Sequence, residues 1–134
     1  SGPLLDRIDI HLEVVPVPFK KLAEMNASES SDAVRKRVLS ARKIQEERFA
    51  ENNGVYANAQ MTSKLIREHV LLDEESNELI KNAMDRLGLS ARAYDRILKV
   101  SRTIADLDQS ENIQADHLAE AIHFRSLDRE NWGT

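Results

Sequence analysis

The first element that the sequence predicts is marked by strict alternation of apolar and polar residues. From Ile8 to Val14 every second residue is apolar, and polar side chains fill the positions between them. Period two over seven residues is typical of a half-buried β-strand, here residues 8–15, which Pro16 and Pro18 end. A single strand cannot satisfy its own backbone groups. It is therefore expected to pair with a second copy or, as we favour, to belong to a sheet whose other strands are missing here.

The next segments repeat with helical period. A helix is predicted from about Asp32 to Phe49. Its inward stripe is expected to contain Val34, Val38, Ala41, Gln45 and Arg48, broadened by Leu39, Ile44 and Phe49. Asn52-Asn53-Gly54 breaks the pattern. A short helix over residues 61–69 then turns Met61, Leu65 and Ile66 inward.

The last three helices carry clear end signals. Asp73 is a suitable N-cap for a helix that Gly88 ends as a C′ glycine, and Ser90 caps a helix that runs to about Leu107. A final helix spans about residues 115–127. The predicted fold class is all-α, a bundle of four to five helices with one N-terminal strand. The expected organisation is a core end at 1–18, a linker at 19–30, a helical lid at 31–130 and a tail at 131–134, with Trp132 as an anchor in the tail.

Composition excludes several chemistries. The 134 residues contain no cysteine, which removes disulfides, thiolate metal sites and cysteine nucleophiles. No apolar run is long enough to cross a membrane, and the start lacks the pattern of a signal peptide, so a cytoplasmic location is expected. The four histidines show no metal-ligand spacing, and no metal site is predicted.

One predicted helix is rich in basic residues, although the net charge of the chain is −4. Arg35, Lys36, Arg42 and Lys43 lie in the first long helix and are candidate DNA contacts, because phosphate binding needs little more than clustered cations. A solvated surface is the commoner explanation of such a cluster. No aromatic residues are interleaved with these cations, which weakens the case for single-stranded nucleic acid.

Two further arginines occupy unusual positions. Arg92 lies in the first turn of a capped helix, where a cation faces the positive end of the helix dipole and where anions tend to bind. Arg7 stands just before the predicted strand. On spacing alone, Arg92 is as well explained by an ion pair with Asp95 or by solvent, and Arg7 by an ion pair with Asp6 or Asp9.

Two long motifs resemble one protein family. The stretch Gly2-Pro3-Leu4-Leu5-Asp6-Arg7-Ile8-Asp9 is similar to the segment that carries the arginine finger in magnesium-chelatase-like AAA+ ATPases. Residues 89–107, which begin Leu89-Ser90-Ala91-Arg92, resemble the sensor-2 helix of the same family. Residues 117–122 and 125–129 are similar to the ComM/YifB branch.

The resemblance implies roles for both arginines. Arg7 would be the arginine finger, acting in trans on the nucleotide of a neighbouring subunit, and Arg92 the sensor-2 residue, contacting the γ-phosphate of its own subunit's ATP. The intact protein would bind ATP and Mg²⁺ and assemble with identical subunits, as a hexamer. The sequence contains neither the G-x-x-x-x-G-K-[ST] loop nor an apolar strand ending in paired acidic residues. This chain alone is therefore expected to be inactive and to bind no cofactor.

Three functions follow as expectations. The resemblance to the ComM/YifB branch implies a DNA-remodelling motor, with helicase or branch-migration activity in recombination or transformation. A magnesium-chelatase-type ATPase subunit is the alternative within the family. A non-enzymatic helical module that binds DNA or acts as a scaffold is the alternative from another class, although it explains neither the unpaired strand nor Arg92.

Overall fold

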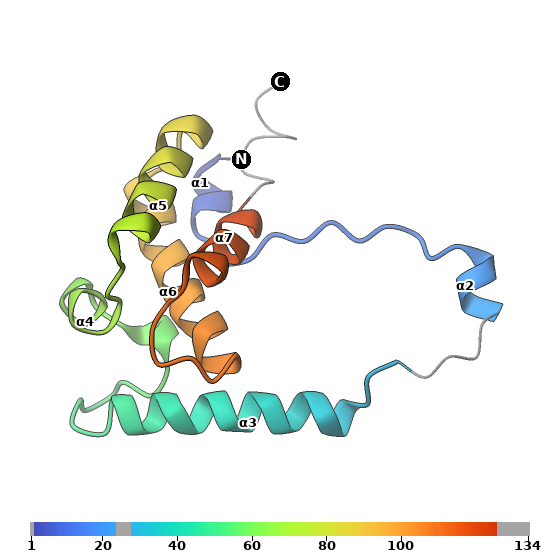
Figure 1. Cartoon of the computed structure of the whole chain (residues 1–134), viewed down its shortest axis with the longest axis horizontal. Coiled ribbons are helices and arrows are strands. Elements are labelled where there is room, and N and C mark those ends of the chain that lie inside the picture. The colour runs from blue at the N-terminus through green and yellow to red at the C-terminus, as the bar shows by residue number, and fades with distance from the viewer. Residues whose placement is uncertain (1, 24–27, 126–134) are drawn as a thin grey trace.

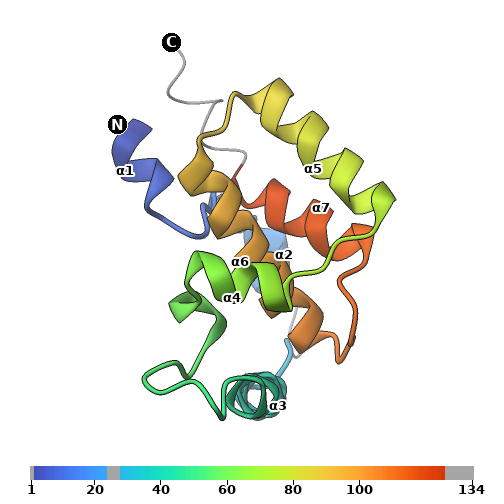
Figure 2. The same ribbon diagram turned by 90° about the vertical axis from the view of Figure 1, so that its left-hand side faces the viewer.

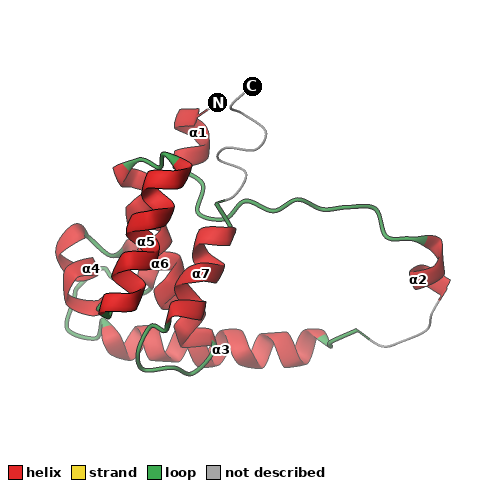
Figure 3. Cartoon of the chain, turned by 45° about the horizontal axis from the view of Figure 1, so that its top comes forward, coloured by secondary structure: helices red, strands yellow, loops and turns green. Residues whose placement is uncertain are grey.

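The computed structural model describes residues 2–23 and 28–125, in which helices are the regular structure and no strand is present (Figure 1, Figure 3). Two five-residue helices come first, α1 (Gly2–Asp6) and α2 (Phe19–Ala23), followed by the long α3 (Ser31–Arg48). A short 3₁₀ turn, η1 (Asn58–Gln60), precedes α4 (Ser63–His69), α5 (Glu74–Leu87), α6 (Ala91–Leu107) and α7 (Ala115–His123). The all-α prediction is confirmed, and α3 to α7 account for its bundle.

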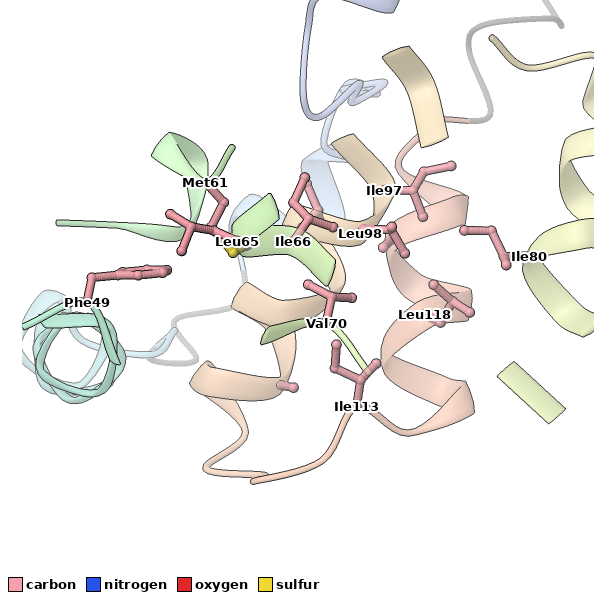
Figure 4. Close-up of a cluster of buried hydrophobic side chains, with 13 residues drawn as sticks. Phe49, Met61, Leu65, Ile66, Val70, Ile80, Ile97, Leu98, Ile113 and Leu118 are labelled. Atoms are coloured by element: carbon pink, nitrogen blue, oxygen red, sulfur yellow. The ribbon is translucent and has the colours of Figure 1, made fainter. Parts of the chain in front are cut away.

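Helix α6 is the centre of the bundle. It packs against α7, α3, α4 and η1, while α5 packs against α7 (Figure 2). The apolar core is aliphatic except for one phenylalanine (Figure 4), and its buried residues are Phe49, Met61, Leu65, Ile66, Val70, Ile80, Ile97, Leu98, Val100, Ala105, Ile113, Leu118 and Ala121. Burial of this surface is the main force that holds the helices together.

The predicted helix ends are found where local chemistry places them. The side chains of Asp73 and Ser90 accept hydrogen bonds from the backbone N–H groups of Ser76 and Ala93. Gly88 has φ +59°, the left-handed conformation that a C′ residue needs and that glycine adopts without strain. Helix α4 begins two residues later than predicted, because Thr62 is its N-cap. Helix α7 ends at His123, short of the predicted Leu127, and residues 126–134, with Trp132, lie outside the described part.

The predicted strand is wrong for this structure. Residues 8–18 form no helix or strand, and the side chains of residues 12–18 are exposed. The alternating pattern needs a neighbouring strand to become a ladder, and the described residues contain none. His11 is instead buried, and its backbone N–H donates to Phe124 O at 2.8 Å. Helix α2 lies within residues 19–30, the expected linker, and none of its residues is buried.

Helix α3 extends past the bundle at its N-terminal half (Figure 1, Figure 3). Ala41, Gln45 and Phe49 of the predicted inward face are buried, whereas Val34, Val38 and Leu39 are 39%, 45% and 53% exposed. The periodicity was therefore right over the second half only, because α6 and its loop reach no further along α3. Among the described residues no helix is both long enough and apolar enough to span a membrane.

Candidate nucleotide-contact site

Arg92 occupies the first turn of α6 with its side chain exposed. The Ser90 hydroxyl accepts from Ala93 N at 3.2 Å and satisfies one of the helix's free donors. Within the described residues, the side chain of Arg92 makes no hydrogen bond or ion pair, with Asp95 or with any other residue. Its guanidinium is therefore available to an anion from outside the bundle, at the end of the helix where the dipole also favours one.

Arg7 lies just after the last residue of α1 and is also exposed. Its Nη1 donates to Pro3 O at 2.8 Å across one turn. Among described residues it has no ion pair with Asp6 or Asp9, the partners considered from spacing alone. A single neutral hydrogen bond leaves most of the five N–H donors of the guanidinium free for another ligand.

Arg96, one turn after Arg92 on α6, joins the two regions. Its Nε donates to Asp6 O at 2.9 Å, and its Nη1 forms an ion pair with Asp9 (Figure 2 shows α1 beside α6). The Arg96 and Asp9 side chains are 30% and 45% exposed. One arginine thus holds both sides of Arg7, and the two candidate arginines lie on segments that are directly tethered to each other.

Arg125 supports the same turn from the end of α7. It is 1% exposed, and its Nη2 donates to Leu5 O at 2.9 Å while its Nη1 donates to Ile8 O. The Nε2 of His11 lies 3.1 Å from Leu5 O as well. Sequence reasoning assigned no role to Arg96 or Arg125, because their partners are 87 to 120 residues away in the chain.

The candidate DNA contacts lie on α3. Arg35, Lys36, Arg42 and Lys43 are all exposed and have no ion pair with another described residue. Arg37 differs, because it pairs with Glu29, which raises the pKa of Arg37 and lowers the pKa of Glu29. The four candidate DNA contacts therefore have no counterion among the described residues, whereas Arg37 is paired with Glu29.

A buried polar network that sequence reasoning did not identify joins α3, η1 and α6. Asp106, 1% exposed, accepts from Arg48 at 2.7 and 2.8 Å, from Asn58 at 2.9 Å and from Arg102 at 3.2 Å. Burial lowers the pKa of Arg102, Asp106 opposes that effect, and the neighbouring Arg48 adds to it. Arg48 was expected on the inward stripe of α3, but its burial is polar rather than apolar.

Histidines and acids do not form a metal cluster among the described residues. His117 is buried, and its Nδ1 accepts from Gln114 N at 2.9 Å while its Nε2 donates to Asp108 at 2.7 Å. These bonds hold the start of α7, because the imidazole accepts from the N-cap backbone as a capping residue does. The histidine therefore has a structural role.

Comparison with known proteins identifies the family of the chain. Residues 28–125, more than half of the chain, match the family described as "Magnesium chelatase, subunit ChlI C-terminal". Competence protein ComM of Haemophilus influenzae is 43% identical over 130 residues, which are 96% of this chain and 25% of that protein. The uncharacterized protein YifB of Escherichia coli is 42% identical over the same shares. A third relative, an uncharacterized protein of Mycobacterium bovis, is 32% identical over 93% of this chain and 24% of its own length.

The chain belongs to the magnesium-chelatase-like AAA+ family. Its similarity to ComM and YifB places it in the ComM/YifB branch. It spans about a quarter of the length of these curated relatives. The activity, substrates and partners of the whole protein are therefore proposals.

Proposed function

We propose that this chain is the lid and subunit-interface part of a hexameric AAA+ ATPase, and that the intact protein binds ATP and Mg²⁺ and remodels DNA. The observation that carries the proposal is the pair Arg7 and Arg92. Both guanidiniums are exposed and without an ion pair among described residues, and they stand on two segments tethered by Arg96. Exposed arginines held on a rigid support suit contacts with the oxygens of a transferring phosphoryl group.

In this proposal Arg7 acts in trans. It reaches the ATP of the neighbouring subunit and stabilises the charge that spreads over the γ-phosphoryl oxygens during hydrolysis. In the full-length ATPase, Arg7→Ala is expected to lower kcat by about 10³-fold or more while ATP binding is spared. Steady-state hydrolysis and a fluorescent-nucleotide binding assay measure the two quantities. Normal turnover in Arg7→Ala would remove this residue from the finger role.

Arg92 is proposed to contact the γ-phosphate of its own subunit's ATP and so to report the nucleotide state to the lid. Arg92→Ala is expected to lower kcat by about 10²-fold, the loss typical of one preorganised donor. Arg67→Ala is the matched control, since Arg67 is an exposed arginine on α4 without an ion pair among the described residues. Unchanged kinetics in Arg92→Ala would leave Arg92 as a surface residue.

Mixed hexamers test which subunit each arginine serves. If Arg92 acts on its own subunit's ATP and Arg7 on the neighbour's, a site needs the two residues from different subunits. Mixing Arg7→Ala subunits with Arg92→Ala subunits then restores intact sites, and hydrolysis recovers. If both residues served the neighbour's ATP, each site would need both from one subunit, and the mixture would stay inactive.

DNA is the proposed substrate because α3 presents four uncompensated cations and because a relative is named as a competence protein. The second candidate is a magnesium-chelatase-type subunit, which the family's description favours. Stimulation of ATP hydrolysis by branched DNA separates the two. ATPase activity that is indifferent to DNA would keep the motor and favour a chelatase-type partner.

A further inference from the structure

The backbone around Arg7 has an unusual number of supports from distant parts of the chain. Carbonyl oxygens of Leu5, Asp6 and Ile8 accept hydrogen bonds from Arg96 or Arg125, and Asp9 forms an ion pair with Arg96. The Arg7 side chain takes no part in these contacts and remains exposed. The supports therefore fix the main chain on both sides of Arg7, while its exposed guanidinium makes one hydrogen bond, to Pro3 O.

A five-residue helix has little stability of its own, because too few hydrogen bonds repay its nucleation. The carbonyls at its C-terminal end also lack intrahelical partners. Guanidinium groups are suited to this end, since they donate several bonds in a rigid plane and bring positive charge to the negative end of the dipole. The conformation of α1 and of Arg7 thus depends on α6 and α7.

We propose, on the basis of the function proposed above, that Arg96 and Arg125 are positioning residues that aim Arg7 at the neighbouring subunit's nucleotide. Arg96 follows Arg92 by four residues, so both stand on one face of α6. A shift of α6 when Arg92 gains or loses a phosphate moves the backbone of Arg7 with it. Arg96 then links the nucleotide state read through Arg92 to the finger that serves the adjacent subunit.

The test compares Arg96→Ala, Arg96→Lys and Asp9→Asn in the full-length ATPase. Displacement of a catalytic group by about 1 Å can cost about 10²-fold, so Arg96→Ala is expected to lower kcat by about 10- to 100-fold with KM for ATP within about twofold. Arg96→Lys can keep the ion pair with Asp9 and is expected to recover part of kcat. Asp9→Asn keeps the bond from Arg96 to Asp6 O and is expected to have a smaller effect.

Lys99→Ala is the matched control. Lys99 also lies on α6 and donates to a backbone carbonyl, but to Ala59 O at 3.1 Å rather than to the Arg7 segment. We expect it to leave kcat unchanged. Adding Arg96→Ala to Arg7→Ala is expected to have no further effect on kcat, because Arg96 acts through Arg7. A further loss in that background, or equal losses in Arg96→Ala and Lys99→Ala, would overturn the proposal.

Failure of this inference is distinguishable from failure of the proposed function. If Arg7→Ala is inactive but Arg96→Ala is fully active, Arg7 remains the finger and the positioning role is excluded. If Arg7→Ala hydrolyses ATP normally, the finger itself is excluded. Arg125 is buried and its variants can lose the fold, so Arg96, which is 30% exposed, carries the decisive comparison.

Discussion

At the scale of single residues, the densest set of side-chain hydrogen bonds among the described residues surrounds the carboxylate of Asp106. Two guanidiniums, from Arg48 and Arg102, meet its buried carboxylate together with the Asn58 amide. Removing one charged member of this network is expected to lower the free energy of unfolding strongly, because the remaining charges stay buried without their counterion. The network also links α6 to the half of α3 that the bundle covers.

Asp106→Asn is therefore expected to lower the free energy of unfolding by about 3–5 kcal/mol. The change keeps the shape of the side chain but removes the charge that faces Arg48 and Arg102. Urea denaturation at neutral pH measures the loss, and Asp85→Asn, at an exposed position of α5, is the control, expected within about 0.5 kcal/mol of the unmodified chain. Equal stability of the two variants would mean that the network contributes nothing net.

Contacts between residues far apart in the chain could not be predicted from the sequence. Arg7 and Arg92 were selected by local position and by family resemblance; both are exposed, and their roles stay predictions. The supports of Arg7 were not predictable, because the residues that meet there are 87 to 120 positions apart. Which charges pair over such separations depends on how the helices pack, and periodicity contains no information on that.

At the scale of elements, the helix ends marked by a local capping residue were predicted best. A cap depends on residues within one turn, so Asp73, Ser90 and Gly88 could be assigned from the sequence. The strand failed for the opposite reason, since it requires a partner that the described residues do not contain. The inward face of α3 was right where α6 covers it and wrong at Val34 and Val38, where nothing in the described part of the chain does.

The N-cap of α5 makes stability depend on pH. The hydrogen bond that the backbone N–H of Ser76 donates to Asp73 Oδ1 at 2.8 Å lowers the pKa of Asp73 below its ordinary value of 3.8. Because the folded state favours the ionised carboxylate, this contribution is fully present above the unfolded pKa. It is lost as the pH falls through the lower, folded-state pKa.

Asp73→Asn tests this contribution, since asparagine keeps a cap oxygen but does not ionise. The difference in melting temperature between the unmodified chain and Asp73→Asn is expected to shrink as the pH is lowered from about 5 towards 2–3. Thermal unfolding followed by circular dichroism measures it. A difference that stays constant, or grows in acid, would contradict the assignment of the pKa shift to this cap.

At the scale of the whole molecule, charge is distributed unevenly. The net charge is −4, so the chain as a whole repels nucleic acid. Helix α3 nevertheless exposes four cations that have no ion pair among the described residues. A local basic surface on an acidic protein can contact DNA only where the two meet directly, because salt screens charges beyond about 8–10 Å. Binding should therefore depend on these cations specifically and not on total charge.

The four cations of α3 lead to a prediction for how DNA affinity depends on salt. Replacing Arg35, Lys36, Arg42 and Lys43 together by glutamine changes the net charge from −4 to −8. The slope of log affinity against log salt concentration is expected to become shallower by up to about 3.6, about 0.9 for each phosphate that is no longer neutralised. Fluorescence anisotropy with duplex DNA in the full-length protein measures the slope. Glutamine is close to lysine and arginine in helix propensity, so α3 should persist.

The control must change the total charge equally without touching α3. Glutamine at Lys20, Lys64, Arg67 and Lys81, all exposed, also gives −8. If only the α3 variant flattens the salt dependence, the contact belongs to α3, and the projecting helix is where the motor meets its DNA. If both variants lose affinity to the same extent, the effect is one of net charge, and α3 has no special role. If neither variant changes the affinity or its salt dependence, DNA binds elsewhere on the protein, because the released counterions would then come from cations outside both sets.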